Sequence, residues 1–349
     1  MAVQAVAHPQ AMVEVLVKSR YVGRLAPSPT GALHLGNART FLIAWARARL
    51  NGGRLILRME DLDHPKVKSG AAGAAIDDLR WLGIEWDEGP DRIGANGPYT
   101  QSERIKIYAD AIKRLAEQHR VYPCICSRAD VEAAQSAPHE GESLYYPGCC
   151  RGRFKSFDEA QAMLPDGRLP VWRFKVEPDS EVAFNDGFCG AQSFRVDRTI
   201  GDFALARHRH GAGYMLAMTI DDALMGVSEV VRGDDLLDVT PRQILICQAL
   251  DLTPPSFCHV PLVVGTDGKR LAKRHGDTRI AELRRMGVSR EQILGLLAWW
   301  SGWGERGEEL KIETVLERAA KLPLKRERAI WDGSEDNGGT SACFSRLRP

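Results

Sequence analysis

The stretch RLAPSPTGALHLGNART, from Arg24 to Thr40, contains the change of pattern that decides the fold. It overlaps a short apolar segment at 21–25 that is typical of a buried strand, and its Pro and Gly residues then break regular structure. A helical pattern of apolar residues follows from Gly36 to Leu50. A strand that turns sharply into a helix presents backbone N–H groups that can bind phosphate.

The alternation continues beyond this stretch. A second strand is predicted at Leu55–Met59 and a second helix at Ala71–Leu82, so the order strand, helix, strand, helix predicts a parallel α/β sheet. The later predicted elements are a helix over Arg104–Gln118, a strand within 171–176, an α/β pattern over Tyr214–Arg232, a helix with Thr240 as N-cap, a strand at Val260–Val264, a helix over Ser289–Trp300 with a Ser/Gln capping box, and a helix over Lys311–Leu322.

The size and charge of the chain limit the class of protein. Its 349 residues suggest two domains, or one domain with a large insertion. The net charge of +1 means that any RNA-binding surface is a local patch. No run of about 18 apolar residues occurs, so we expect no membrane span, and residues 1–20 look like an N-terminal extension without a signal-peptide pattern. We expect a cytoplasmic monomer with a polar, disordered tail at 332–349.

Four of the eight cysteines lie between residues 124 and 150. In an intracellular protein such clustering indicates a metal site before it indicates disulfides. Cys124 and Cys126 form a CxC pair, and a third thiolate follows at Cys149 or Cys150. Tetrahedral zinc requires four ligands, so the thiolates alone leave one ligand undetermined.

RLAPSPTGALHLGN at 24–37 resembles the ATP-binding signature of class I aminoacyl-tRNA synthetases, in particular of their glutamate branch. Asn37 stands where the usual tetrapeptide has His, which is a common variant in that branch. The resemblance implies that ATP is bound by His34, Gly36 and Asn37.

A second signature lies more than 230 residues downstream. RLAKR at 270–274 resembles the mobile KMSKS loop, and Lys273 matches the lysine that reaches the ATP phosphates. Its role would be electrostatic, because a cation stabilises the charge that develops on pyrophosphate. Arg270 and Ala272 depart from the pattern, in which Lys and Ser stand at these positions. The two signatures together imply that His34 and Lys273 act in catalysis, with Mg²⁺ accompanying ATP.

Three further matches to the glutamate branch imply an amino-acid pocket. LRMEDLDHPK at 57–66 contains Glu60, which would bind the substrate ammonium; Tyr214 lines the pocket and Arg232 contacts the substrate. Glutamate has two carboxylates and one ammonium, and Arg24, Arg232 and Glu60 match that charge count. Which arginine binds which carboxylate stays open. The predicted set is completed by Leu25, Ala26, Pro27 and Ser28.

The family resemblance also implies the fourth metal ligand. Tyr146 and Cys150 have the spacing of a YxxxC pattern with a tyrosine ligand, although Cys149 remains a rival. The implied structural zinc site consists of Cys124, Cys126, Tyr146 and Cys150, within an insertion that binds the tRNA acceptor end.

The resemblance covers residues 21–276 and implies a Rossmann-like catalytic domain in two halves, at 21–120 and 201–276. A zinc-containing insertion would occupy 121–200, and a short helical region 277–331. Glutamyl-tRNA synthetases continue into a larger helical anticodon-binding domain, whereas only 73 residues follow Gly276 here.

In this shorter C-terminal part the chain resembles a shorter branch of the family. The sequence GDFALAR at 201–207 and the apolar Met218 also resemble that branch. Members of that branch activate glutamate without tRNA and transfer it to queuosine at the wobble position of tRNA(Asp). The alternatives are a shortened glutamyl-tRNA synthetase that charges the tRNA 3′ end, and a non-catalytic RNA-binding paralogue. The KRHG sequence at 273–276 favours the first alternative.

Overall fold

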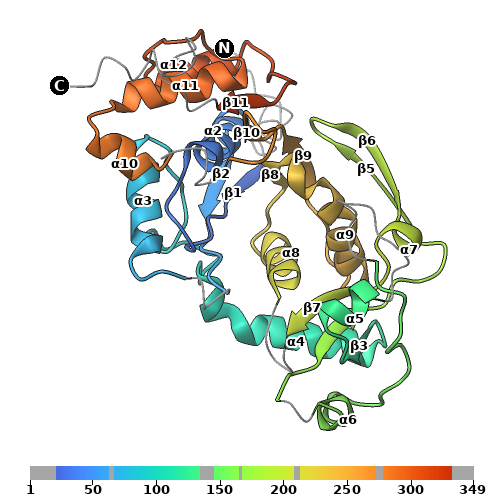
Figure 1. Cartoon of the computed structure of the whole chain (residues 1–349). Coiled ribbons are helices and arrows are strands. Elements are labelled where there is room, and N and C mark those ends of the chain that lie inside the picture. The colour runs from blue at the N-terminus through green and yellow to red at the C-terminus, as the bar shows by residue number, and fades with distance from the viewer. Residues whose placement is uncertain are drawn as a thin grey trace, which may run out of the picture.

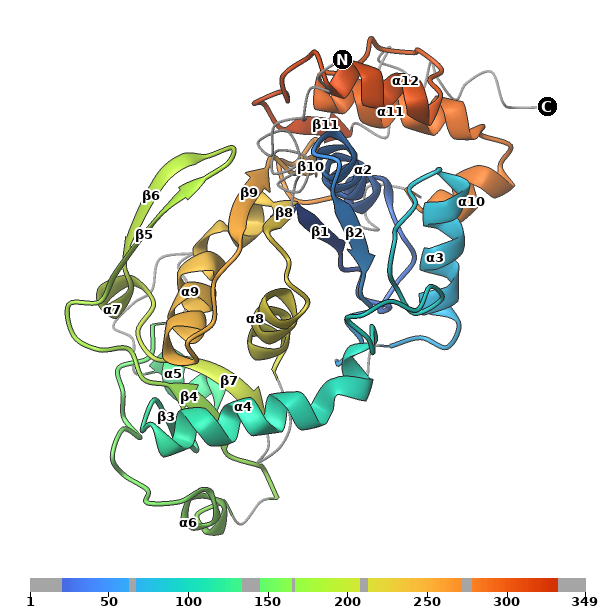
Figure 2. The ribbon, with the colours of Figure 1, turned by 180° about the vertical axis from the view of Figure 1, so that it is seen from behind.

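A computed structural model describes residues 21–62, 67–133, 145–164, 167–207, 213–271 and 278–331. The predicted N-terminal extension and C-terminal tail lie outside these residues. Figures 1 and 2 show a parallel α/β core with helices from the C-terminal part of the chain at one end, and an antiparallel part at the other end. Across the described residues, every helix is too short or too polar to cross a bilayer.

The parallel core confirms the predicted α/β class. Its first unit is two parallel strands joined by a helix, and its second unit is another parallel pair. The Ser228 N–H donates to the Val22 carbonyl at 2.9 Å, which holds the second unit beside the first. These elements are β1 (Val22–Leu25), α2 (Leu35–Leu50), β2 (Arg54–Leu57), α3 (Ala71–Trp81), α8 (Tyr214–Leu224), β8 (Glu229–Gly233), α9 (Thr240–Ala249) and β9 (Ser256–Val260).

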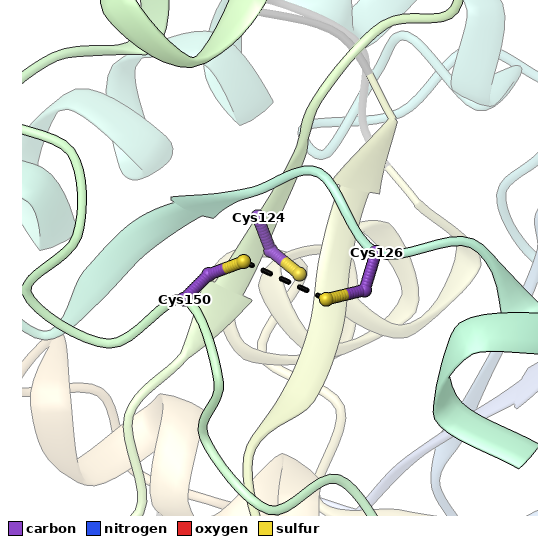
Figure 3. Close-up of side chains that lie close together, drawn as sticks. All are labelled: Cys124, Cys126 and Cys150. Carbon is purple, nitrogen blue, oxygen red and sulfur yellow. Dashed lines mark hydrogen bonds between the residues drawn. The ribbon is translucent and has the colours of Figure 1, made fainter. Parts of the chain in front are cut away.

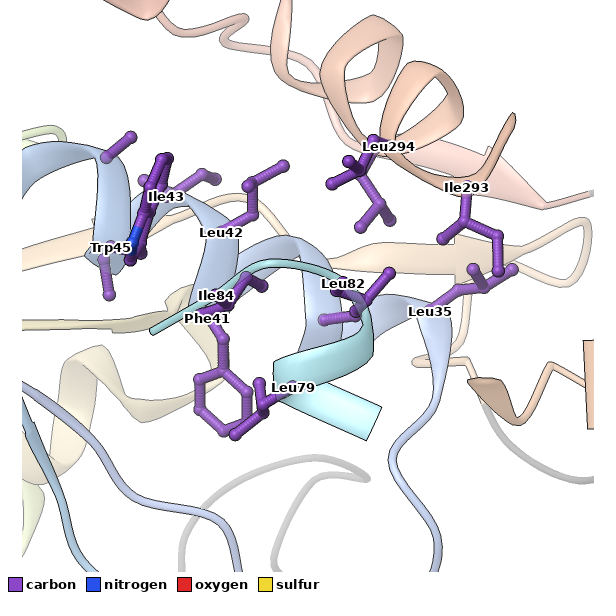
Figure 4. Packing of buried hydrophobic residues seen from close by; sticks show 14 of the residues in the cluster. Leu35, Phe41, Leu42, Ile43, Trp45, Leu79, Leu82, Ile84, Ile293 and Leu294 are labelled. Atoms are coloured by element: carbon purple, nitrogen blue, oxygen red, sulfur yellow. The ribbon is translucent and has the colours of Figure 1, made fainter. Parts of the chain in front are cut away.

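The C-terminal helices pack on this core. One hydrophobic cluster combines side chains of α2, α3 and α11, and Figure 4 shows Leu35 of α2 close to Ile293 of α11. The predicted capping box at Ser289 is confirmed. The backbone of α11 at Gly295 packs directly against the backbone at Glu308, since a Cβ at residue 295 would be 1.7 Å from the Glu308 carbonyl oxygen. The elements are β10 (Val263–Gly265), α10 (Ile280–Arg285), α11 (Arg290–Ser301), α12 (Ile312–Ala319) and β11 (Ala329–Trp331), with β10 and β11 paired in parallel.

The antiparallel part contains a three-stranded sheet in the order β3-β4-β7 and a separate hairpin, β5–β6. Strand β7 belongs to this sheet, which therefore crosses the domain boundary predicted at residue 200. The elements are α4 (Ile105–Glu117), β3 (Val121–Cys124), α5 (Arg128–Ala133), α6 (Phe157–Ala162), β4 (Val171–Phe174), β5 (Glu181–Asp186), β6 (Gly190–Arg195), α7 (Val196–Thr199) and β7 (Phe203–Arg207).

Two local predictions were wrong. The single strand predicted at 260–264 is two strands, β9 and β10, because Pro261 lacks an N–H and interrupts the ladder. Thr240 is not an N-cap: a 3-10 segment over Asp234–Val239 leads directly into α9, so Val239 already has helical dihedral angles. The Thr240 hydroxyl instead accepts a hydrogen bond from Arg232.

Candidate active site and cysteine cluster

A cavity of about 500 Å³ opens where β1 and β8 end and α2 begins. Ligands of open α/β sheets bind at this edge, outside the carboxyl ends of the strands. Eight of the predicted site residues line the cavity, namely Arg24, Ala26, Ser28, His34, Gly36, Asn37, Tyr214 and Arg232.

The other predicted residues are placed differently. Leu25 is fully buried in the hydrophobic core, and Pro27 is buried with its carbonyl accepting from the Glu60 N–H at 3.1 Å. Glu60 is buried and does not line the cavity. Lys273 lies outside the described residues.

The start of α2 is organised by His34. Its Nδ1 accepts from the Asn37 N–H at 3.4 Å, so the neutral ring carries its proton on Nε2. Burial, and then the nearby Arg270, lower the pKa of His34 to about 4. The Leu35 N–H donates to the Thr278 carbonyl. Of the first three amides of the helix, only that of Gly36 therefore has no acceptor within the described part of the chain. Fewer backbone N–H groups are therefore available to a phosphate than the helix start alone predicts.

Position 36 favours glycine for a steric reason. A Cβ there would lie 3.1 Å from Cε1 of His34, so a larger residue would fit only if the imidazole shifted by a few tenths of an ångström.

Beneath the cavity, Arg58 is the centre of a fully buried charge network. It donates to Asp222 at 2.8 Å and to Glu60 at 3.0 Å, and its Nε lies 3.7 Å from Asp221. Burial opposes the charged form, but the carboxylates of Asp222 and Glu60 raise the pKa of Arg58. Burial also raises the pKa of Glu60, and Arg58 opposes this.

Arg24 and Tyr214 connect this network to the cavity. Arg24 donates to the Val231 carbonyl at 2.9 Å, and its Nε lies 3.5 Å from Asp222. Tyr214 is 47% exposed at the cavity, and the Glu60 carboxylate raises the pKa of its hydroxyl. The effect of the Glu60 carboxylate requires it to lie near the Tyr214 hydroxyl.

Arg232 differs from these arginines because no carboxylate contacts it within the described residues. It is 4% exposed, and it donates to His259 Nε2 at 2.9 Å and to Thr240 Oγ1 at 2.8 Å. Burial and the neighbouring Arg24 lower the pKa of Arg232 to about 10, so it stays cationic at neutral pH.

The residues on either side of Lys273 are held at the cavity. Leu271 and Arg270 line it, and Arg270 donates to Asp235 at 2.9 Å. On the other side of the loop, the Ile280 N–H donates to the Leu33 carbonyl at 2.9 Å. The described residues Leu271 and Ile280, on either side of this loop, therefore lie next to the cavity and the HLGN segment.

A second candidate site lies in the antiparallel part. The Sγ atoms of Cys124, Cys126 and Cys150 lie within 4.8 Å of one another, and Figure 3 shows them pointing toward a common centre. The Tyr146 hydroxyl is 3.3 Å from Cys124 Sγ and 3.6 Å from Cys126 Sγ. Cys149 is exposed and outside the group, so the geometry brings together the four residues of the YxxxC interpretation.

The thiols of this group lie in a cationic environment. Arg173 donates from Nε to Cys124 Sγ at 3.2 Å, and its guanidinium lies 3.7 Å from the centroid of the Tyr146 ring. A hydrogen bond from Cys124 is the main cause that lowers the pKa of Cys150 to about 4. Three thiols and one phenol with a nearby cation form a donor set suited to a metal that prefers thiolate ligands.

The sequence analysis missed the residues that support the cavity, chiefly Arg58, Asp222 and His259. One signal was present: Asp221 and Asp222 are adjacent carboxylates within an otherwise apolar helical stretch, and buried carboxylates require cationic partners. No comparable signal pointed to His259.

The profile of the family "tRNA synthetases class I (E and Q), catalytic domain" matches residues 20–325. The chain belongs to this family.

Its relatives narrow this class. The chain is 50% identical over 296 residues to the glutamyl-Q tRNA(Asp) synthetase of Symbiobacterium thermophilum, covering 84% of this chain and 90% of the relative. It is 46% identical over 281 residues to the protein of the same name in Nitratidesulfovibrio vulgaris, with 80% and 86% covered. A solved glutamate tRNA ligase from Elizabethkingia meningosepticum has a TM-score of 0.74 at 26% identity, covering 90% of this chain and 68% of that one.

Proposed function

We propose that this protein activates L-glutamate with ATP, without tRNA, and transfers the glutamyl group to queuosine at the wobble position of tRNA(Asp). The observation that carries the first half is the cavity itself. It combines the start of α2 and His34 with two arginines, Arg24 and Arg232, and it lies close to Glu60.

The charges suit the substrate. Arg232 has no carboxylate partner within the described residues, and a substrate carboxylate would supply one. Arg24 supplies a second guanidinium, and Glu60 with Tyr214 forms the acidic side where an ammonium group fits. In this proposal the glutamate-binding residues are Arg24, Glu60, Tyr214 and Arg232, with backbone support from the segment Leu25–Ser28.

The activation step needs no protein nucleophile. The α-carboxylate of glutamate attacks the α-phosphorus of ATP, a P–O bond forms, and pyrophosphate leaves with the electrons of the broken bond. Neutral His34 donates from Nε2, the Gly36 amide donates from the start of α2, and Lys273 supplies a cation to the leaving group. Mg²⁺ accompanies ATP and neutralises part of the phosphate charge.

In the transfer step, a hydroxyl of the queuosine cyclopentenediol attacks the carbonyl carbon of glutamyl-adenylate. An ester forms, AMP leaves, and the hydroxyl proton passes to solvent or to AMP. The names of the two bacterial relatives support queuosine in tRNA(Asp) as the acceptor, because this chain covers 90% and 86% of their lengths.

The cysteine group supports a structural zinc ion. Cys124, Cys126, Cys150 and Tyr146 would hold it in a closed four-ligand site, where a bound zinc would tie β3 to the segment around Cys150. No open coordination position is needed, so this metal has no step in the reaction.

The test uses the full-length protein in two assays. Glutamate-dependent ATP–pyrophosphate exchange without tRNA measures activation, and we expect it with glutamate but not with glutamine or aspartate. Transfer of labelled glutamate is then measured to tRNA(Asp) with and without queuosine. Transfer to the 3′ end of tRNA(Glu) would replace this proposal with the shortened glutamyl-tRNA synthetase. No exchange at all would favour the non-catalytic paralogue.

A further inference from the structure

Arg232 is hydrogen-bonded without being neutralised. Its Nε donates to His259 Nε2 at 2.9 Å, and its Nη2 donates to Thr240 Oγ1 at 2.8 Å and to the Leu236 carbonyl at 3.3 Å. An imidazole nitrogen, a hydroxyl and a carbonyl are all uncharged acceptors. Nη1 donates to none of the residues that the structure describes, and Arg232 lines the cavity.

Burying a guanidinium in this way is costly, because a buried charge normally has a counter-charge. Arg58, which is fully buried, shows the usual arrangement with Asp222 and Glu60. The protein therefore provides acceptors for three of the five N–H groups of Arg232, on Nε and Nη2. The positive charge and the two N–H groups of Nη1 are left for a ligand.

His259 can accept from Arg232 only in one tautomer. Its Nδ1 lies 2.6 Å from Asp186 Oδ2, and both side chains are fully buried. Because Nε2 accepts from the arginine, Nδ1 must carry the proton and donate it to Asp186. The reversed tautomer would place an N–H of His259 against the N–H of Arg232.

Asp186 is itself held as an anion. Burial alone would raise its pKa, but hydrogen bonds from His259 and from the amides of Cys189 and Phe188 lower the pKa of Asp186 to about 2. Burial lowers the pKa of His259. The chain of groups is thus an ionised carboxylate, a neutral imidazole and a cationic guanidinium.

We propose that Asp186 and His259 are positioning residues for the glutamate pocket: they fix the imidazole tautomer that orients Arg232 while keeping a carboxylate out of contact with its guanidinium. This inference rests on the proposed function, since it assumes that the free edge of Arg232 binds a carboxylate of glutamate. The imidazole acts as a spacer, so that the charge of Arg232 is left for the substrate.

The device also connects two parts of the fold. Asp186 is the last residue of β5, in the hairpin that lies beside β9 in Figure 1, and the Gly187 N–H donates to the Phe257 carbonyl at 2.7 Å. His259 lies on β9, and Arg232 lies on the neighbouring β8. The β5–β6 hairpin of the predicted insertion therefore reaches the amino-acid pocket through one imidazole.

The test compares His259→Leu with His259→Gln in glutamate-dependent ATP–pyrophosphate exchange. His259→Leu removes the acceptor, and we expect the KM for glutamate to rise roughly 10- to 100-fold, as for a lost hydrogen bond to a charged group, with the KM for ATP changed less than about twofold. His259→Gln places an amide oxygen near the position of Nε2 and should keep the KM for glutamate within about threefold of wild type. Ser193→Ala, on the exposed face of the same hairpin, is the matched control.

A second pair keeps the test decisive if His259→Leu does not fold. Thr240→Val removes the closer of the two acceptors of Nη2 and should raise the KM for glutamate roughly 10-fold, whereas Thr240→Ser should restore it. Wild-type KM values in Thr240→Val and in every folded His259 variant, together with a raised KM in Arg232→Leu, would overturn the positioning role alone. A wild-type KM in Arg232→Leu as well would instead contradict the glutamate pocket of the proposed function.

Discussion

The cysteine group and the cavity are both polar regions inside the protein, but they differ in whether their polar groups contact one another. In the cysteine group, three thiols and the Tyr146 hydroxyl point at one another, and Arg173 lies against them. In the cavity, the side chains point toward open space, and the cation of Arg232 has no carboxylate within the described residues.

In the proposed function, this difference separates a structural metal site from a substrate site. A closed set of four donors has room for one ion and no substrate, so its occupation can stabilise the fold but cannot turn over. A cavity with an uncompensated cation is stabilised by an anionic ligand that enters and leaves. Two of the buried arginines, Arg58 and Arg232, show the same contrast at a smaller scale, because carboxylates of the protein neutralise Arg58 and do not contact Arg232 within the described residues.

The largest effect is expected at Arg58. Arg58→Leu leaves Glu60, Asp221 and Asp222 without their common cation, and breaking such a buried network costs about 3–5 kcal/mol of unfolding free energy. Urea unfolding of the variant and of wild type measures this. Unchanged stability would show that the network under the cavity is not a structural element.

Arg232→Leu should separate binding from folding. We expect glutamate activation to lose about 2–5 kcal/mol in kcat/KM, since the substrate carboxylate loses its partner. The unfolding free energy should change by less than about 2 kcal/mol, because only neutral acceptors are left unpaired. Pyrophosphate exchange and urea unfolding of the same preparation test both statements. A loss of stability as large as that of Arg58→Leu would remove the contrast between the two arginines.

The cysteine group is tested with Cys150→Ala and its matched control Cys149→Ala. Cys150→Ala should abolish stoichiometric zinc, whereas Cys149→Ala should retain it, because Cys149 is exposed and outside the group. With free zinc a hundredfold above its Kd, the lost ion corresponds to about 3 kcal/mol of stability. Metal analysis and thermal unfolding with and without a chelator measure these effects. Zinc loss in Cys149→Ala alone would establish the rival ligand.

The smallest effect is a pH dependence at His34. Its pKa is lowered to about 4 from 6.5, so the folded state favours the neutral ring. The resulting stability is fully present above pH 6.5 and is lost as the pH falls toward 4, by about 1–3 kcal/mol. Thermal unfolding between pH 4 and 7 should therefore show a steeper acid loss in wild type than in His34→Asn. Parallel curves would mean that His34 is not desolvated at the cavity.

The sequence predicted the alternation of strands and helices, because apolar periodicity and Pro/Gly breaks act locally. It also placed the HLGN segment at the start of α2 and identified the four residues around the cysteine group. Its predictions at Thr240 and at 260–264 were wrong because adjacent residues changed the local structure. A 3-10 segment continues directly into α9, and Pro261 divides one apolar run into two strands.

The sequence by itself therefore determined the α/β class, the order of the elements and the residue types that converge on the cavity, because these follow from patterns within a few residues. Only the tertiary structure decided which charges are neutralised. Arg58 and Asp222 are 164 positions apart in the sequence, and Arg232 and His259 are 27 positions apart. The fold decides that the first buried cation contacts a carboxylate and that the second contacts an imidazole. Such partners are chosen by packing between distant segments, and the free energy of a buried charge depends on that choice.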